Sequence, residues 1–476
     1  MRPNSFHIWR QCDGAQITMN YYNVSMNFLE PRLSVLMGND GKMVSEFPII
    51  YYLVACLYKL FGPHEFFIRL ISVTIFFVGL FSLYKALHLL LKDRTYAFLV
   101  SLIPFASAVV SDYAFSFIPD VPALSLTFVG YFYFLRFMQS KSRRSAYLAT
   151  LFFALAGLLK VTSLIGFLAI GGVLLYYRIF MARTVEVKEY LAFSREFVIM
   201  MVVPVLVSAA WVFYAGYYNA ANHNTYFLMK AQPIWKAEGE YILTILHRFH
   251  WQWLRMYLYR DFLHTLPLLA ILCFAFFKRS SAKPVLLWLT LSMAGGVAYF
   301  LLFFTQFYHH DYYVICLMFL PPAIVAVLLL RIQEWAPAVY QSLFSKAALL
   351  LLLAVMFYHG IRINRERDAL YATEKFNEFR YIEPALEKLG VKKTDKVISL
   401  GDETTGVSLY LMNRRGWTEV MSPIPLPSKT IQQYVDAGAK YLFIYRDADS
   451  HLEEESRQRY LQSMVGIVNG IKIYKL

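Results

Sequence analysis

Charged residues are scarce in this chain of 476 residues. Asp, Glu, Lys and Arg together make up 16% of it, whereas soluble domains contain roughly 25%. Hydrophobic residues reach 58%, and apolar stretches long enough to cross a bilayer about 30 Å thick recur along the sequence. The scarcity of charge therefore argues against an ordinary soluble protein and predicts a polytopic membrane protein.

Cysteine and the common nucleotide or hydrolase motifs are also missing or rare. The sequence has no Walker A, GxGxxG, HExxH or GxSxG string, so nothing supports a nucleotide-driven or hydrolytic enzyme. Internal repeats are not evident, which weakens the case for a transporter built from inverted halves. The few cysteines have neither disulfide nor metal-site spacing: they are Cys12, Cys56, Cys273 and Cys316.

Ten apolar segments are long enough to be predicted as membrane spans. The predicted fold is therefore mainly α, a polytopic helical membrane bundle followed by a small C-terminal extracytoplasmic α/β domain. The predicted spans are 66–91, 96–112, 120–138, 145–159, 162–180, 198–218, 264–277, 284–306, 314–330 and 346–360.

Basic residues alternate between the connectors of these spans. Lys and Arg are absent from connectors 113–119 and 307–313 but frequent in the others, and the net charge of +14 falls largely there. The positive-inside rule makes the basic connectors cytoplasmic and puts both ends of the chain outside, so the charge predicts no nucleic-acid partner. The basic connectors are Lys92–Arg94, Lys141–Arg144, 178–196, Lys278–Lys283 and the one that Arg331 begins.

An outside N-terminus with no apolar segment before it is unusual. The simpler interpretation is that a first span is missing, so that the natural protein has about eleven spans and a cytoplasmic start. We expect three regions: an outer segment 1–65, a bundle 66–360 and a soluble domain 361–476. Within the first, Pro48–Phe61 is short for a span and predicts an interfacial helix.

Composition changes after residue 360, where charges become frequent and short runs alternate. This alternation predicts a small α/β domain. The β-rich runs are Lys396–Leu400, Val407–Met412, Tyr441–Tyr445 and Gly470–Leu476, and the helical candidates are 378–389, 429–437 and 451–463.

Three carboxylates near the predicted outer face are candidates for chemistry. Asp13 lies in the string His7–Asp13, Glu46 in Ser45–Pro48, and Asp120 opens a span. A carboxylate near a membrane has a high free-energy cost, so it usually has a function or forms an ion pair. The alternatives are an ion pair with Arg10 for Asp13, a solvated loop for Glu46, and helix capping for Asp120.

Two cationic side chains could bind a phosphate group. Lys160 stands in an outer turn after Gly157, and Arg69 lies near the outer end of the first predicted span. Lys suits phosphate because its ammonium is a compact point charge. The alternative is that the side chain of Lys160 only extends to the interface.

The loop Tyr308–Tyr313 is dense in polar aromatic groups. Its His309, His310 and Asp311 could ligate a metal, although adjacent residues converge poorly on one ion. Hydrogen bonding to a sugar or phosphate, together with interfacial packing of Tyr312 and Tyr313, is the other interpretation. No cofactor is predicted, and a divalent metal is left open.

Taken together these strings resemble the family 39 glycosyltransferases of the GT-C superfamily. That family includes protein O-mannosyltransferases and lipid A aminoarabinose transferases, and the resemblance extends over essentially the whole chain. Its pieces are Asp13, Glu46-Phe47-Pro48, Arg69, Pro119–Pro122, Gly157–Lys160, His310–Tyr313 and Asn413–Trp417.

The resemblance implies an enzyme of the cell envelope that takes a sugar from a polyprenyl-phosphate carrier at the outer membrane face. Asp13 would be the base that deprotonates the acceptor hydroxyl, and Lys160, helped by Arg69 or Arg10, would neutralise the leaving phosphate. Asp120 would orient the sugar or acceptor, and Tyr313 would contact the phosphate or sugar. The acceptor would be a lipid, glycan or protein, transfer would be inverting, and the membrane would be a bacterial plasma membrane.

Two positions depart from the better-known members. Phe47 stands where the aminoarabinose transferases carry Lys, and Gly14 follows Asp13 where the protein mannosyltransferases have an Asp-Glu pair. Neither substrate assignment therefore transfers. The alternative function is a transporter or flippase for lipid-linked saccharides, which would need polar residues through the middle of the membrane.

Overall fold

The computed structural model describes residues 3, 7–37, 39–180, 195–227, 230–274, 282–371 and 376–476. Most of the basic connector 178–196 and of Lys278–Lys283 lies outside these residues. The chain forms two compact units. Unit 1 contains residues 1–68, 213–228 and 367–476, and unit 2 contains residues 69–212 and 229–366.

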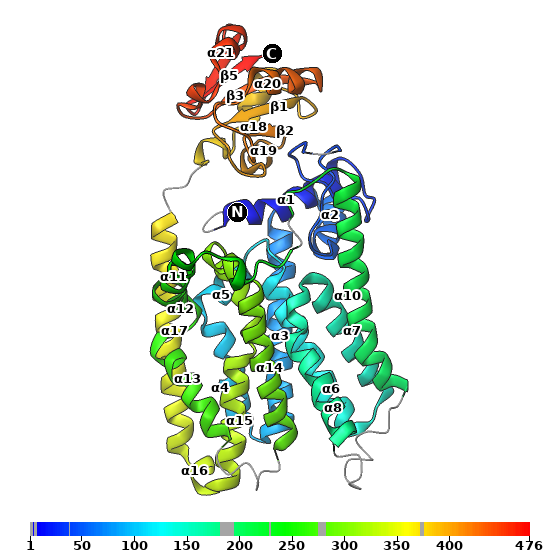
Figure 1. Ribbon diagram of the computed structural model, residues 1–476, viewed down its shortest axis with the longest axis vertical. Coiled ribbons are helices and arrows are strands. Elements are labelled where there is room, and N and C mark those ends of the chain that lie inside the picture. Colours follow the sequence, from blue (N-terminus) through cyan, green and yellow to red (C-terminus); the bar gives the residue numbers. More distant parts are fainter. Residues whose placement is uncertain are drawn as a thin grey trace. The chain divides into compact units, whose positions relative to one another are not determined.

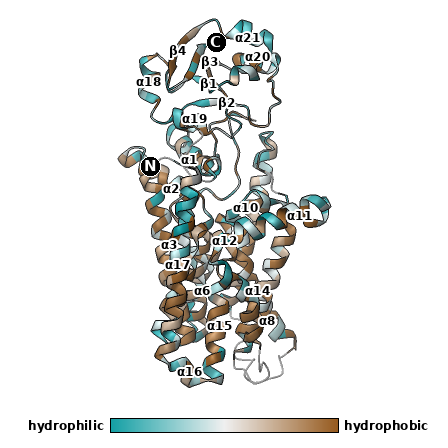
Figure 2. Ribbon diagram, turned by 90° about the vertical axis from the view of Figure 1, so that its left-hand side faces the viewer, coloured by the Kyte–Doolittle hydropathy of each residue, from teal (hydrophilic) through white to brown (hydrophobic). Residues whose placement is uncertain are grey.

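Unit 2 is helical throughout its described part, and its long helices run side by side (Figure 1). Hydrophobic residues predominate along these helices (Figure 2), as expected of helices that cross a membrane. The helices are α3 (Phe66–Leu91), α4 (Arg94–Ser101), α5 (Ala108–Ala114), α6 (Asp120–Ser140), α7 (Arg143–Leu159), α8 (Ile165–Phe180), α10 (Arg195–Ala221), α11 (Gly239–Arg248), α12 (Leu254–Tyr257), α13 (Arg260–Cys273), α14 (Lys283–Leu302), α15 (Leu320–Trp335), α16 (Pro337–Gln341) and α17 (Leu343–Tyr371). One end of α3, of α10 and of α17 belongs to unit 1. Short 3-10 turns join several of them: η1 (Ile103–Ala106), η2 (Val161–Leu164), η3 (Ile234–Lys236), η6 (Phe304–Tyr308) and η7 (Asp311–Leu317), and a π-helical turn, η4 (Phe249–Trp253), joins α11 to α12.

Each of the ten predicted spans overlaps a helical segment, although residues 275–277 of the span 264–277 lie outside the described residues, and fewer helices have the length of a span. Seven helices of the described chain are long and apolar enough to cross a membrane. An eighth candidate is a pair of segments, Arg94–Ala106 and Ala108–Ala114, bent by 79°. The difference from ten comes from α7 and α13, which have 17 and 14 residues. By length, the helices of the described residues support seven or eight of the ten predicted spans, and the span 264–277 continues beyond the described residues.

Helices α6 and α7 form an antiparallel hairpin that positions two predicted site residues. Asp120 begins α6, and Lys160 follows the last residue of α7. Both residues therefore lie at the same end of the hairpin, while Lys141 lies at its turn. Gly130 allows the close approach of the two helices, because a Cβ atom there would lie 2.7 Å from the Phe153 ring.

Unit 1 combines a small sheet with two helices from the start of the chain. The helices are α1 (Ile8–Asn23), α2 (Ile49–Phe61), α18 (Glu383–Lys388), α19 (Val407–Met412), α20 (Ser428–Asp436) and α21 (Glu454–Tyr460), with 3-10 turns η8 (Asn377–Phe379) and η9 (Ala448–His451). The strands are β1 (Lys396–Leu400), β2 (Arg415–Thr418), β3 (Ala439–Ile444), β4 (Met464–Val468) and β5 (Ile471–Lys475). The mixture of helices and strands after residue 376 matches the predicted α/β composition.

The sheet has the strand order β2-β1-β3-β5-β4 (Figure 1). Strand β1 runs parallel to β2 and β3, whereas β5 runs antiparallel to β3 and β4. Ile398 of β1 pairs with Trp417 and Leu442, and these three side chains belong to its buried core. Beyond β2, Gly416 exchanges backbone hydrogen bonds with Ser34 and Leu36, so the outer segment extends the sheet.

The prediction of a strand at 407–412 is wrong, because this segment is helix α19. All six of its side chains are buried, and a short apolar run buried on every side does not distinguish a strand from a helix. Local polar groups decide the outcome. The Thr404 hydroxyl accepts a hydrogen bond from the Val407 N–H, and the Asp402 carboxylate accepts one from the Ser408 N–H, which satisfies the first turn. Strands β2 and β4 were not predicted.

Candidate functional site

Asp13 lies on the buried face of α1, in unit 1. The buried face of this helix is unusually polar, since its buried residues include Gln11, Asp13, Gln16 and Asn20. Their side chains find partners in neighbouring segments rather than in water. Gln16, for example, accepts a hydrogen bond from the Ser34 N–H and donates one to the Thr405 carbonyl. A buried polar face of this kind is stable only when its groups are paired.

The Asp13 carboxylate is fully buried and contacts three polar side chains. Thr405 donates a hydrogen bond from Oγ1 to Oδ1 at 2.7 Å. The Tyr226 hydroxyl and Arg10 Nη1 each lie 3.5 Å from Oδ2. The expected ion pair with Arg10 is therefore present, but it is long, and the shortest contact comes from Thr405, which is not among the predicted site residues.

Burial raises the pKa of Asp13 from its usual value of 3.8 to about 6. The nearby Arg10 charge and the Thr405 hydrogen bond act in the opposite direction, and the Glu46 charge adds to the rise. A carboxylate with this pKa is ionised at neutral pH and is a stronger base than an exposed aspartate. The environment therefore suits a general base.

Arg10 links Asp13 to Glu46. Its Nη2 lies 2.5 Å from Glu46 Oε1, which also accepts a hydrogen bond from the Tyr51 hydroxyl at 2.9 Å. Ser45 donates to the other Glu46 oxygen. Glu46 is thus part of a polar cluster rather than a solvated loop residue, and the structure brings together all three predicted residues of unit 1.

Thr405 reaches Asp13 from the turn that precedes α19. Asp402, which is fully buried, accepts hydrogen bonds from the side chains of Thr404 and Ser408 and from both of their backbone N–H groups. No sequence rule could have identified Thr405, since 392 positions separate it from Asp13. The same is true of Tyr226, which is 213 positions away.

In unit 2, Asp120 and Lys160 form an ion pair. Lys160 Nζ lies 2.9 Å from Asp120 Oδ1, and it also lies 4.8 Å from the centre of the Tyr313 ring. Such a cation over an aromatic face is held electrostatically. The side chain of Lys160 is therefore directed at partners within the protein, and simple extension to a membrane interface does not describe it.

Helix capping does not account for Asp120. It is the first residue of α6, the N-cap is Pro119, and no side chain caps this helix. Within the described part of the chain, Asp120 Oδ2 is buried and accepts no hydrogen bond. A buried carboxylate oxygen without a donor is costly, and it is the kind of group that a ligand hydroxyl would satisfy.

The segment Tyr308–Tyr313 contains a buried carboxylate, that of Asp311, which begins η7. Asp311 is fully buried and accepts a hydrogen bond from the Tyr113 hydroxyl at 2.8 Å, and the Tyr113 ring packs edge-on against Tyr312. His310 stacks on Tyr313, with ring centres 4.9 Å apart. The predicted residues Asp311, Tyr312, Tyr313 and His310 therefore lie in one cluster, to which Lys160 belongs through its contact with Tyr313.

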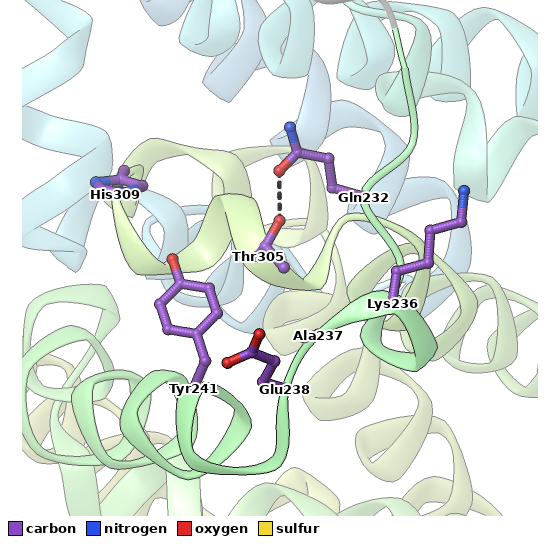
Figure 3. A pocket seen from close by; sticks show the side chains of 7 residues that line it. All are labelled: Gln232, Lys236, Ala237, Glu238, Tyr241, Thr305 and His309. Atoms are coloured by element: carbon purple, nitrogen blue, oxygen red, sulfur yellow. Dashed lines mark hydrogen bonds between the residues drawn. The ribbon is translucent and has the colours of Figure 1, made fainter.

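His309, whose ring centre lies 6.2 Å from that of His310, also lines a polar groove (Figure 3). The other lining residues are Gln232, Lys236, Ala237, Glu238, Tyr241 and Thr305. The Thr305 hydroxyl donates a hydrogen bond to Gln232. Charged, amide and phenol groups around one groove suit a ligand rich in hydroxyls.

Arg69 contacts the segment before α6. Its Nη1 donates to the Phe115 carbonyl at 2.5 Å, and its guanidinium lies 5.1 Å from the centre of the Phe117 ring. This places Arg69 beside the turn that leads into Asp120. Among the described residues, no group of three or more His, Cys, Asp or Glu side chains is arranged to hold a metal.

Sequence comparison finds one family match. The family model described as dolichyl-phosphate-mannose-protein mannosyltransferase matches residues 45–211, a range that includes Glu46, Arg69, Asp120 and Lys160. A search of curated proteins finds no match.

Solved structures with a similar fold include ArnT and an oligosaccharyltransferase. ArnT from Cupriavidus metallidurans in the apo state has a TM-score of 0.61 and 14% identity, covering 98% of this chain and 93% of its own. The same protein bound to undecaprenyl phosphate has a TM-score of 0.60 and 12% identity, covering 100% and 94%. The Archaeoglobus fulgidus oligosaccharyltransferase, tethered with an acceptor peptide, has a TM-score of 0.53 and 11% identity, covering 93% and 65%.

These likenesses define the class of protein. The chain is an integral multi-pass membrane protein with the fold of a GT-C superfamily glycosyltransferase. The match over residues 45–211 adds a sequence similarity to the mannosyltransferase family named above, over less than half of the chain. The resemblance drawn from short sequence strings is confirmed.

Proposed function

We propose that this protein transfers a sugar from a polyprenyl-phosphate carrier to an acceptor hydroxyl at the outer face of a bacterial plasma membrane. The observation that carries the proposal is the environment of Asp13: a fully buried carboxylate, held by Thr405 and Arg10, with its pKa raised to about 6. A structural ion pair alone would not require a basic, desolvated carboxylate.

Asp13 is the general base in this reaction. The acceptor hydroxyl gives its proton to the carboxylate as its oxygen forms a bond to the anomeric carbon of the sugar, and the bond from that carbon to the carrier phosphate breaks. The phosphate leaves with the bonding electrons, so a general acid is not required. A single displacement of this kind inverts the anomeric configuration.

Lys160 stabilises the departing phosphate. Its ammonium already contacts Asp120 and the face of Tyr313, so it is positioned before any phosphate arrives, and preorganised charge is the most effective kind. Arg10 is held by Glu46 and Asp13, and Arg69 by the Phe115 carbonyl. In this proposal Lys160 is the principal phosphate ligand, because its ammonium is a compact point charge, and Arg69 or Arg10 helps it.

Asp120 orients a hydroxyl of the sugar through Oδ2, the oxygen that accepts no hydrogen bond in the described part of the chain. Tyr313, whose ring lies against the Lys160 ammonium, contacts the sugar or the phosphate. The fold relative crystallised with undecaprenyl phosphate supports a carrier of the polyprenyl-phosphate class.

The test is carrier turnover in liposomes that contain a labelled polyprenyl-phosphate sugar and an extract of envelope acceptors. We expect Asp13→Asn to lower turnover about 10²-fold or more, because the amide cannot accept the proton. Asp436→Asn is the matched control, since it makes the same change at an exposed position of unit 1. Wild-type turnover by Asp13→Asn would refute the assignment of the base.

A further inference from the structure

The carboxyl-terminal part of the chain supplies a side chain to the Asp13 site. Thr405 is 1% exposed and is tied to α1 through two groups. Its hydroxyl donates to Asp13 Oδ1 at 2.7 Å, and its carbonyl accepts from Gln16 Nε2 at 3.1 Å. Both partners are themselves fully buried, so the contact is made in a desolvated environment, where hydrogen bonds to an ionised group are strong.

The turn that carries Thr405 is fixed independently of Asp13. Asp402 accepts four hydrogen bonds from Thr404 and Ser408, between 2.5 and 2.9 Å long. The Thr404 carbonyl accepts a hydrogen bond from the Thr418 hydroxyl at 2.7 Å. Gly406 follows with a φ of 104°, in the region that favours glycine. The Thr405 hydroxyl is therefore presented by a rigid support.

The two oxygens of Asp13 differ in their contacts. Oδ1 accepts the short bond from Thr405, whereas the contacts of Oδ2 with Arg10 and Tyr226 are both 3.5 Å long. An oxygen with a short, strong donor is a poor proton acceptor, because that donor stabilises its negative charge. Oδ2 is the oxygen left for a substrate proton.

We propose that Thr405 is a positioning residue that fixes the Asp13 carboxylate, so that Oδ2 faces the acceptor hydroxyl. This inference rests on the proposed role of Asp13 as the base. It gives the carboxyl-terminal part of the chain a direct function in catalysis without placing it in contact with substrate.

The charged and titratable groups around Asp13 come from three segments. They are Arg10 on the same helix, Glu46 in the outer segment and Tyr226 after α10. Thr405 is uncharged at every pH, so replacing it changes the hydrogen bond to Asp13 without adding or removing a charge. A change in the pH profile after substitution is therefore attributable to the carboxylate.

The experiment compares Thr405→Val, Thr405→Ala and Thr405→Ser in the carrier turnover assay between pH 5 and 8. We expect Thr405→Val and Thr405→Ala to lower kcat about tenfold or more and to move the acid limb of kcat upward by about one pH unit. KM for the carrier should change little. Thr405→Ser, which keeps the hydroxyl, should retain the wild-type profile.

Each outcome bears on the inference. A wild-type kcat and acid limb in the Val or Ala variant would overturn it, and so would a loss of protein stability with an unchanged acid limb. Asp13→Asn is measured in parallel: if that variant is inactive while Thr405→Val behaves as wild type, only the positioning role fails. If Asp13→Asn turns over normally, the base assignment and the positioning role fail together.

Discussion

At the scale of single residues, the raised pKa of Asp13 predicts how activity depends on pH. The base must be ionised, and its pKa is about 6. We therefore expect kcat to be constant above about pH 7 and to fall tenfold for each pH unit well below 6. A pH series of carrier turnover in liposomes measures this. A profile that is flat down to pH 4 would contradict a base with this pKa.

The burial of Asp13 also predicts how folded stability depends on pH, and stability changes with pH in the opposite direction to activity. The folded protein binds the Asp13 proton more tightly than the unfolded chain, so folded stability falls as pH rises from 3.8 to about 6. The cost at neutral pH is about 3 kcal/mol at 1.36 kcal/mol per pKa unit. We expect Asp13→Asn to keep or raise the Tm at pH 7.5 while losing activity. A lowered Tm would indicate that Asp13 is mainly structural.

Lys160 offers a separate test at the residue scale. Removing its ammonium by Lys160→Ala should lower kcat about 10²–10³-fold, the usual effect of losing one preorganised group that stabilises charge in the transition state. Lys160→Arg should retain part of the activity. The matched control is Lys92→Ala, at an exposed position of the same unit. Inhibition constants for free polyprenyl phosphate would show whether Lys160 contacts the phosphate, since the Ala variant should bind it more weakly.

At the scale of elements, the pairing of β1 with β2 depends on Gly416. A Cβ atom at this position would lie 1.7 Å from the Val397 carbonyl oxygen. This clash cannot be relieved by a rotamer change, because the contacted atom belongs to the backbone. We expect Gly416→Ala to destabilise unit 1 by more than about 3 kcal/mol and to reduce turnover, because β2 follows the helix that Thr405 precedes. Gly216→Ala, where nothing lies within 4 Å of the added carbon, should be neutral in thermal unfolding and in turnover. Equal behaviour of the two variants would contradict the close packing.

The elements also show how far sequence reasoning reaches. Long apolar helices such as α3 and α17 were predictable because each buries its own backbone polar groups and needs only length and composition. Helix α19 was mistaken for a strand because its six residues are buried on every side and carry no periodicity. Two consecutive helices place Asp120 and Lys160 at the same end of the α6–α7 hairpin, which was predictable, whereas the ion pair between the two side chains was not.

At the scale of the whole molecule, the candidate site could be predicted only in part. Charged residues near the predicted outer face stand out, since charge close to a membrane is costly, and this made Asp13, Asp120 and Lys160 candidates. Thr405 and Tyr226 could not be found, because neutral residues of common type give no signal and their contacts with Asp13 join distant parts of the chain. The turn around Asp402, which supports Thr405, was not predicted for the same reason.

The central claim is that the protein breaks the bond between a sugar and its lipid phosphate, and a doubly labelled carrier tests it most directly. With one label on the sugar and another on the polyprenyl chain, liposomes containing the wild-type protein and acceptor extract should separate the two labels. Asp13→Asn liposomes should leave them joined. Labels that stay joined in the wild type while the intact carrier moves between leaflets would contradict a transferase and indicate a flippase.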